Sequence, residues 1–600
     1  MPLVVFHTQK VRDALKSPAT LGIDVLLLCA VGALVGGLVM FTKQVAAPYM
    51  PKVEISLSFW ALPRYTLFSL SRGFAAYFIS LVFTLIYGTI AAHNEAAQKV
   101  MIPALDVLQS IPVLGFLPGL VLAMIALFPS REVGLEIACI IMIFTAQAWN
   151  MTFSFYGSLR SIPSPLREVV RIHHLGAWKA FRLLEVPASM IGLVWNSMMS
   201  MAGGWFFLAA VEAFTLKGRD FRLPGIGSYM QEALNQFESD KLATWMPIFG
   251  AIVAMIVMIV VVDQIFWRPI VVWAERFKME ETAEAEKPES WVLNLMERSS
   301  IYNALMRHLK PRVRPLEIDP AATPNAALAP VAPALARGST WKTTGPVLTR
   351  ILQWLVLAAL VYGAGWGAVS LIRLLIALPV HNADGSDWAH VLLALLASFA
   401  RTTAAVAIGA AWALPAGIMI GLSPKWSQRL QPVVQVVASF PAPMLFPLVI
   451  LGLAAVHAPF NIACVALMLL GTQWYILFNV IAGAMAIPGE LKEVCRVYDT
   501  SPWKRWTRLY IPCVFPHLVT GMVTAAGGAW NATIVSEYLQ VKDHTYIAFG
   551  LGSIISQAAD NNFPLLAAAI VTMAVSVVIL NRLIWKRMYR IAEERYALNM

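Results

Sequence analysis

Long, continuous apolar runs separated by short polar stretches dominate the sequence. Many runs reach the roughly 20 residues that an α-helix needs to cross the hydrocarbon core of a bilayer. They do not alternate as the strands of a membrane β-barrel would. We predict twelve spans, six in each half, at about 21–41, 66–92, 101–127, 133–156, 189–213 and 244–266, and at about 351–372, 389–421, 430–454, 459–482, 515–538 and 563–585.

Composition agrees with a polytopic helical membrane protein. The 600 residues are 58% hydrophobic and only 13% charged, whereas about a quarter of the residues of a soluble domain are charged. The net charge of +11 does not indicate nucleic-acid binding, because Lys and Arg flank the apolar runs instead of forming a basic arm. They follow the positive-inside rule, which predicts that both termini and the middle of the chain lie in the cytoplasm.

The two halves of the chain repeat one another. Arg72 and Arg401 match at an offset of 329 positions, as do the segments Ser110–Pro112 ("SIP") and Ser439–Pro441 ("SFP"). An offset of 325 relates the pairs Trp149/Trp474, Phe153/Phe478, Trp205/Trp530 and Glu212/Glu537. These matches predict an all-α fold of two homologous six-helix bundles in one chain.

Two basic islands are the clearest copies, at about 162–187 and 487–512. "LREVVRIHHLGAWKAFRLLEVP" (166–187) is followed 325 positions later by "LKEVCRVYDTSPWKRWTRLYIP" (491–512). Each island begins after a helix-breaking Pro, and its apolar residues have helical spacing with charges between them, which predicts a short amphipathic helix along the membrane. A second helical piece rich in Trp, Lys and Arg should follow.

The islands resemble the cytoplasmic loop of binding-protein-dependent ABC permeases, written EAA-x3-G-x9-I-x-LP. Its Glu precedes its Pro by 19 positions, as Glu168 precedes Pro187 and Glu493 precedes Pro512. The two alanines are replaced by Val169 and Val170 and by Val494 and Cys495, and the Gly position holds His174 or Asp499. "GGAWNATIVSEYL" (527–539) and the C-terminal tail are similar to the nitrate, sulfonate and taurine branch, and the tandem form resembles duplicated anion permeases.

The resemblance implies a type I ABC importer with the MetI-like transmembrane fold, located in the bacterial inner membrane. In that family the loop is a coupling helix that docks on an ATPase subunit, so one chain with two loops would serve two ATPase subunits. A separate periplasmic or lipid-anchored solute-binding protein is also implied, with a small anion as substrate: nitrate, a sulfonate, bicarbonate or an organic acid. The coupling residues by this resemblance are Glu168, Arg171, Gly176, Trp178, Pro187, Glu493, Arg496, Trp503 and Pro512.

The domain organisation follows from a change of composition in the middle of the chain. Residues 276–345 open charged and become Pro/Ala-rich, which is typical of a linker, and the first part is expected to carry a short helix. The halves are then 1–275 and 346–600. No Walker A motif is present in the sequence and the linker is too short for an ATPase domain, so we expect no enzyme activity and no cofactor of the chain's own, with ATP used by a partner. The five cysteines have no metal-ligand spacing, and no metal site is predicted.

A secondary transporter of the major-facilitator type is the alternative, since it also has twelve spans around a central cytoplasmic loop. The loops after the second span of each half, "AAHNEAAQKV" and "GLSPKWSQRL", do not fit the loop of that family, which is basic, contains Gly and includes an acid.

Six further residues are candidates for the substrate pathway: Arg72, Arg401, Trp205, Glu212, Trp530 and Glu537. A charge within a span is costly and usually faces protein or a water-filled path. Arg72 and Arg401 are therefore expected to attract an anion, to extend to the lipid headgroups or to pair with a carboxylate. Glu212 and Glu537 could supply that carboxylate or shape an outer gate.

Overall fold

The computed structural model describes residues 18–47, 53–110, 112–129, 132–173, 175–216, 219–237, 245–277, 290–299, 347–382, 387–541 and 544–596. By compactness the chain divides into two units. The smaller contains residues 1–28 and 294–377, and the larger contains residues 29–293 and 378–600. Apart from residues 1–28 and the first helix of the second half, nearly all of both halves therefore lies in the larger unit.

The described part of the first half is mainly helical. Its elements are α2 (Pro18–Val45), η1 (Phe59–Ala61), α3 (Leu62–His93), α4 (Glu95–Ser110), η2 (Val113–Phe116), α5 (Leu117–Leu127), α6 (Val133–Arg160), α7 (Ser164–Ile172), α8 (Ala177–Ala180), η3 (Phe181–Glu185), α9 (Val186–Val211), β1 (Ala213–Leu216), β2 (Arg219–Arg222), α10 (Ile226–Phe237), α11 (Trp245–Val261), η4 (Val262–Trp267), α12 (Arg268–Ala274) and η5 (Glu275–Phe277).

The second half repeats this order. Its elements are α15 (Val347–Ala377), α16 (Trp388–Leu422), α17 (Pro424–Ser439), α18 (Ala442–Ala455), α19 (Phe460–Met485), α20 (Gly489–Val497), α21 (Pro502–Arg505), η6 (Trp506–Tyr510), α22 (Ile511–Ser536), β3 (Tyr538–Val541), β4 (His544–Ile547), α23 (Leu551–Asn561), α24 (Phe563–Leu580), η7 (Asn581–Trp585) and α25 (Lys586–Tyr596). Helix α13 (Trp291–Arg298) is the short helix expected in the linker, most of which lies outside the described residues.

Seven described helical segments are long and apolar enough to cross a membrane, and each corresponds to one predicted span. They are Phe59–His93, Val133–Arg160, Trp245–Phe277, Trp388–Leu422, Phe460–Met485, Pro502–Ser536 and Phe563–Tyr596. The predicted spans at 21–41, 189–213 and 351–372 fall on helices α2, α9 and α15, but these are not among the seven. Their crossing stays a prediction.

The predicted third span of each half, at about 101–127 and 430–454, is interrupted, and in the second half its two bent pieces together are long and apolar enough for one span. In the second half, Val433–Ser439 and Ala442–Ile450 meet at an angle of 83°, and the break lies at the repeated "SFP" segment. In the first half, α4 ends at Ser110 and Pro112 precedes η2. Phe440 has an extended conformation (ψ 128°), as a residue before proline prefers, so the Pro that interrupts an apolar run also bends the chain.

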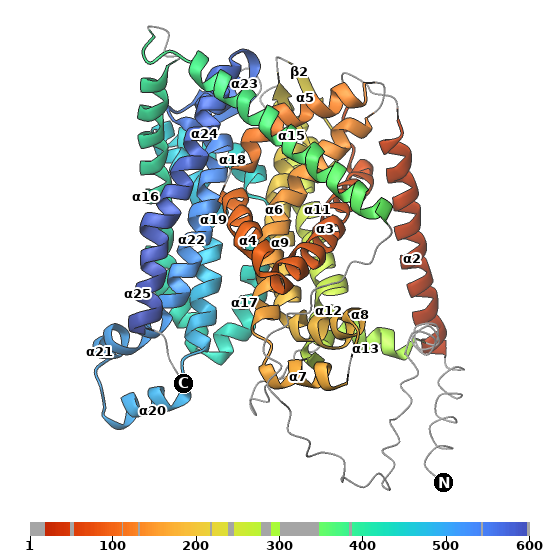
Figure 1. The fold of residues 1–600 in the computed structure, drawn as a ribbon, viewed down its shortest axis with the longest axis vertical. Coiled ribbons are helices and arrows are strands. Elements are labelled where there is room, and N and C mark those ends of the chain that lie inside the picture. Colours follow the sequence, from red (N-terminus) through yellow and green to blue (C-terminus); the bar gives the residue numbers. More distant parts are fainter. Residues whose placement is uncertain are drawn as a thin grey trace. The chain divides into compact units, whose positions relative to one another are not determined.

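Within the larger unit, each half is built on three long helices. Helix α6 packs between α3 and α9, and α19 packs between α16 and α22; Figure 1 shows these long helices side by side. A short antiparallel hairpin follows the third helix of each set, β1–β2 and β3–β4, and leads into α10 or α23.

The broken third spans join the two halves. Helices α17 and α18 pack against α9, α10 and α11 of the first half. In the same way, α4 and η2 pack against α22, α23 and α24 of the second half. The bent segment of each half packs against the other half, so the interface contains two equivalent sets of contacts.

Candidate functional site

The two basic islands fold alike. Helices α7 and α20 are nine residues long with strongly separated apolar and charged faces, and neither contains a buried residue. Each is followed by a one-turn helix, α8 or α21, a π-helical turn, η3 or η6, and then α9 or α22 without interruption. The predicted pair of helical pieces is therefore confirmed in both islands.

A turn of left-handed backbone separates the two helices of the second island. Asp499, at the Gly position of the loop motif, has φ 39°, a conformation that glycine adopts most easily. The Thr500 amide donates to the Cys495 carbonyl at 3.2 Å, which closes the end of α20. Leu175 donates to Val170 at 3.1 Å at the matching place in the first island, whereas His174 lies outside the described residues.

A proline explains why a π turn precedes each long helix. Pro187 and Pro512 have no amide hydrogen, so an α-helix passing through them loses one backbone hydrogen bond. In both halves the π turn ends two residues before the proline, and such turns accommodate a break without ending the helix. The island is thus connected to α9 or α22 by continuous helix.

Seven of the nine predicted coupling residues are exposed on the islands, and Pro187 and Pro512 are half-buried in the first turn of α9 and α22. Glu168, Arg171, Gly176, Glu493 and Arg496 are exposed. Trp178 and Trp503 are 71% and 77% exposed, and Val497 and Tyr498 at the end of α20 are similarly open. Large apolar side chains beside charged ones on a small amphipathic helix are suited to a protein partner.

Arg72 lies at the centre of a buried cluster in the first half. Its guanidinium makes a bidentate pair with Glu136 (Nε–Oε2 2.6 Å, Nη2–Oε1 2.7 Å) and a second pair with Glu212 (Nη1–Oε1 2.7 Å). Nη1 also donates to the Pro224 carbonyl at 2.9 Å. All three charged side chains are at most 1% exposed, so the arginine is a structural partner of carboxylates from α6 and the end of α9.

Glu212 connects this cluster to the start of α10. Its Oε2 accepts from the Gly227 amide at 2.7 Å, and its Oε1 accepts from the Ser69 hydroxyl at 2.6 Å. The Ile226 amide donates in turn to the Ser69 oxygen at 3.0 Å. A carboxylate placed on the free amides of a helix N-terminus satisfies them and complements the helix dipole. We call Ser69, Arg72, Glu136, Glu212 and the Gly227 amide the first anchor.

The second half builds the same anchor with one change. Arg401 pairs with Glu537 (Nη1–Oε1 2.8 Å), and Glu537 accepts from Ser398 and from the Gly552 amide. The position of Glu136 is taken by Asn461, whose Oδ1 accepts from Arg401 Nη2 at 2.7 Å. Ser398, Arg401, Asn461, Glu537 and the Gly552 amide form the second anchor, which has one carboxylate fewer.

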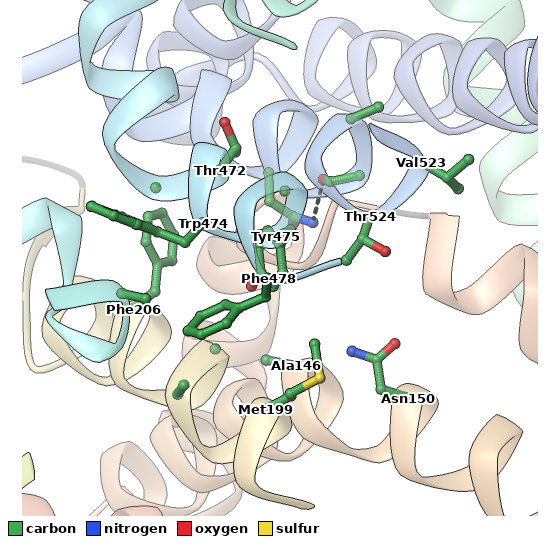
Figure 2. Close-up of a pocket in the computed structure, with 18 of the residues that line it drawn as sticks. Ala146, Asn150, Met199, Phe206, Thr472, Trp474, Tyr475, Phe478, Val523 and Thr524 are labelled. Atoms are coloured by element: carbon green, nitrogen blue, oxygen red, sulfur yellow. Dashed lines mark hydrogen bonds between the residues drawn. The ribbon is translucent and has the colours of Figure 1, made fainter. Parts of the chain in front are cut away.

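A cavity of about 780 Å³ lies between the two halves. Helices α6 and α9 of the first half and α19 and α22 of the second supply most of its wall, and the bend between α17 and α18 closes one side. Met485 and Ala486, immediately before the second island, also line it. Figure 2 shows Ala146, Asn150 and Met199 facing Thr472, Tyr475 and Phe478 across this space.

The candidate pathway residues separate into two groups. Trp530 lines the cavity, whereas Arg72, Arg401, Glu212 and Glu537 do not: they belong to the anchors. Trp205 is also away from it, with its ring packed against Gly73 of α3. The pairing of the arginines with Glu212 and Glu537 is confirmed, and the geometry favours this alternative over attraction of a substrate.

Sequence reasoning missed residues that the repeat could have identified. Glu136 and Asn461 are 325 positions apart, as are Asn150 and Tyr475. The residue types at these equivalent positions differ between the halves, so a search for identical residues at a fixed offset does not find them. Both pairs lie next to residues that do match.

A second pair of contacts crosses between the halves near the cavity. Gln435 Nε2 donates to Asp263 Oδ1 at 3.0 Å, and Asn581 Nδ2 approaches Asp106 Oδ1 at 3.4 Å. Each contact joins a broken third span to the last long helix of the other half. The third span supplies the amide in the first contact (Gln435) and the carboxylate in the second (Asp106). The contact is thus conserved in kind while its acid and amide are exchanged.

Comparison with known proteins identifies the repeated unit. Residues 84–266 and 413–589 each match the family described as "binding-protein-dependent transport system inner membrane component". Each match covers an island together with helices that line the cavity.

Three relatives illustrate the similarity. The bicarbonate transport system permease protein CmpB of Synechocystis sp. is 28% identical over 192 residues, 32% of this chain and 65% of that protein. The nitrate import permease protein NrtB of Leptolyngbya laminosa is 27% identical over 161 residues, 27% of this chain and 56% of the relative. The putative aliphatic sulfonates transport permease protein SsuC of Bacillus subtilis is 25% identical over 142 residues, 24% and 50% of the two chains.

The chain therefore spans between about half and two thirds of the length of these relatives. With two matched regions that together cover more than half of its residues, the chain belongs to the family of binding-protein-dependent transport system inner membrane components and contains the family's domain twice.

Proposed function

We propose that this protein is the complete transmembrane pathway of an ABC importer for a small anion. One observation carries the proposal: two exposed amphipathic helices with the same motif, α7 and α20, each lead through a short turn into a second helical piece that is continuous with a long helix lining the shared cavity. A movement of either docking helix caused by an ATPase would reach the cavity wall through this turn and the continuous helix after it. Membership of the permease family replaces the major-facilitator alternative.

The partners follow from this arrangement. Two copies of a separate ATPase subunit dock on α7 and α20 on the cytoplasmic side of the bacterial inner membrane, where both termini also lie. A periplasmic or lipid-anchored solute-binding protein delivers substrate to the opposite face. The chain itself hydrolyses no ATP and holds no cofactor.

The proposal that the substrate is an anion draws on the relatives. They are named for bicarbonate, nitrate and aliphatic sulfonates, three anionic solutes. The buried arginines are engaged in the anchors, so they are not the reason for this assignment.

Stoichiometry tests the proposal directly. Native mass spectrometry of the complex purified from its source should show one copy of this chain with two ATPase subunits. A complex with two copies of the chain per ATPase pair would show that the two halves do not form one pathway.

Charge reversal tests the islands. Glu168→Lys combined with Glu493→Lys should leave the protein in the membrane but abolish ATP-driven uptake, because both carboxylates lie on the exposed surface of the docking helices. Glu594→Lys on exposed α25 is the matched control and should transport normally. Full uptake by the double variant, with the ATPase still bound, would contradict the docking role.

A further inference from the structure

We propose that Asn150 and Tyr475, one from each half, bind the head group of an organic monoanion, a carboxylate or sulfonate whose apolar body lies on the aromatic wall of the cavity. The inference rests on the proposed function, because it concerns the substrate of the same pathway.

Asn150 and Tyr475 have polar groups that no protein group uses. Among the described residues, neither the Asn150 amide nor the Tyr475 hydroxyl has a hydrogen-bond partner, and both residues line the cavity. Two threonines of the same wall are engaged by their own helices: Thr472 donates to Met468 and Thr524 to Thr520. Both side chains are half-buried and line the cavity, so their polar groups are free to bind a ligand there.

The repeat places these two groups at equivalent positions. Asn150 on α6 and Tyr475 on α19 are 325 residues apart and follow the matched Trp149 and Trp474. The indole N–H of Trp149 is buried without a partner, whereas that of Trp474 donates to Leu470 at 2.9 Å. In Figure 2, Asn150 and Tyr475 project from opposite sides of the cavity. Of these two equivalent indole N–H groups, only that of the first half is therefore unpaired.

Tyr475 lies beside two glycines, one from each half. A Cβ atom built on Gly203 of α9 would lie 3.5 Å from the Tyr475 hydroxyl, and one on Gly528 of α22 would lie 3.4 Å from its ring. The phenol thus lies between α9 and α22, and its hydroxyl lies next to α9, in the half that contains Asn150. A ligand held by both groups would bridge the halves, and a rearrangement of the halves would change its binding.

The charge of the wall limits the charge of the ligand. The described residues that line the cavity include no Asp, Glu, Lys or Arg. Neutral amide and hydroxyl donors can replace part of the hydration of a single negative charge, but the cost of transferring an ion from water rises with the square of its charge. Two neutral donors therefore suit a monoanion, and they hold it weakly enough to be released.

The aromatic surface favours an organic ligand. Phe206, Trp474 and Phe478 line the same space as Met199, beside the two polar groups. Apolar surface removed from water stabilises binding, but a small inorganic anion has none to offer and would have to lose water against these rings. A carboxylate or sulfonate with an aliphatic body uses both parts of the cavity.

Calorimetric titration of the purified chain in nanodiscs tests the ligand class. The probes are 1-butanesulfonate and pentanoate, compared with nitrate, bicarbonate and sulfate at equal ionic strength, and with uncharged pentanamide. We expect both organic monoanions to bind at least tenfold more tightly than any inorganic anion or the amide. Equal or tighter binding of nitrate, bicarbonate or sulfate, or no binding of the organic anions, would overturn the proposal.

Variants test the two residues. Tyr475→Phe should weaken the organic monoanions about tenfold, since it removes one hydrogen bond to a charged group. Asn150→Asp keeps the size of the side chain but adds a negative charge, so it should abolish their binding. Tyr87→Phe is the control: its hydroxyl donates to the Met101 carbonyl at 2.7 Å away from the cavity, and it should bind as the unchanged protein does.

The experiment separates this inference from the proposed function. Unchanged binding in Tyr475→Phe and Asn150→Asp would remove the site even if the chain still assembles with two ATPase subunits. A failure to assemble with an ATPase would instead overturn the proposed function, and binding in nanodiscs would be unaffected by it.

Discussion

The two anchors use the same geometry with different charge. Each holds an arginine, a serine and a glutamate at the N-terminus of a short helix, but the first adds Glu136 where the second has Asn461. The first anchor thus places two carboxylates on one guanidinium that is fully buried, and the second places one carboxylate on a guanidinium that is 11% exposed. Both amide and carboxylate oxygens can accept from arginine, so the fold requires an acceptor at this position and not a particular charge.

The difference determines what happens when an arginine is lost. Arg72→Gln leaves Glu136 and Glu212 buried without a cation, and breaking a buried pair costs about 3–5 kcal/mol. Arg401→Gln leaves Glu537 with its Ser398 and Gly552 donors, so we expect a smaller loss. Thermal unfolding and the yield of intact protein in nanodiscs measure both. Equal stability of the two variants, or normal stability of Arg72→Gln, would contradict the comparison.

The shared part of the anchors should respond equally in both halves. A Cβ atom on Gly225 or Gly550 would lie 2.3 Å from a carboxylate oxygen of Glu212 or Glu537, respectively. Gly225→Ala and Gly550→Ala must therefore displace a carboxylate that is fixed by arginine, and each should cost about 1–3 kcal/mol, as overpacking does. Unfolding temperatures of the two variants would show this. Gly119→Ala, with open space around it, is the control.

Converting one anchor into the other is expected to have a smaller effect. Glu136→Asn reproduces the acceptor of the second anchor. Arg72 then keeps its ion pair with Glu212, and no buried charge is left without a partner. We expect a change of about 1 kcal/mol, well below that of Arg72→Gln. A loss as large as that of Arg72→Gln in the same melting assay would mean that the second carboxylate, and not an acceptor, is required in the first half.

The helices that carry the two arginines begin differently, which gives the smallest predicted effect. Asp387 caps α16 by accepting from the His390 amide at 2.6 Å, while Ala61 before α3 makes no side-chain cap. Backbone hydrogen bonds from His390 and Asn382 lower the pKa of Asp387 below its ordinary value of 3.8. Its stabilisation is therefore complete above the ordinary pKa and is lost as the pH falls through the lowered one.

Asp387→Asn should remove this dependence, because asparagine is also a good cap and does not titrate. Below pH 3.8, the ordinary pKa of Asp387, we expect the unfolding temperature of the original protein to fall slightly more than that of the variant. Identical acid profiles for the two would show that the cap does not contribute to this difference between the halves.

The sequence alone was sufficient for the features that local chemistry controls. Apolar runs predicted the spans that remain straight, and charge with helical spacing predicted the amphipathic islands of 162–187 and 487–512. The repeat of Glu, Trp and Pro at fixed spacing indicated the permease family. These features depend on neighbours in the chain, so they can be recognised without knowing what lies nearby in space.

The tertiary structure decided the features that depend on distant partners. An apolar run does not reveal that "SFP" bends it by 83° or that the bent segment packs on the other half. A buried arginine in a span is equally compatible with a substrate and with a carboxylate, and only the folding of α3 against α6 and the end of α9 brings Arg72 to Glu136 and Glu212. The sequence does not distinguish Asn150 and Tyr475 from other polar residues. Their lack of hydrogen-bond partners is visible only in the folded chain, because it depends on every atom around them.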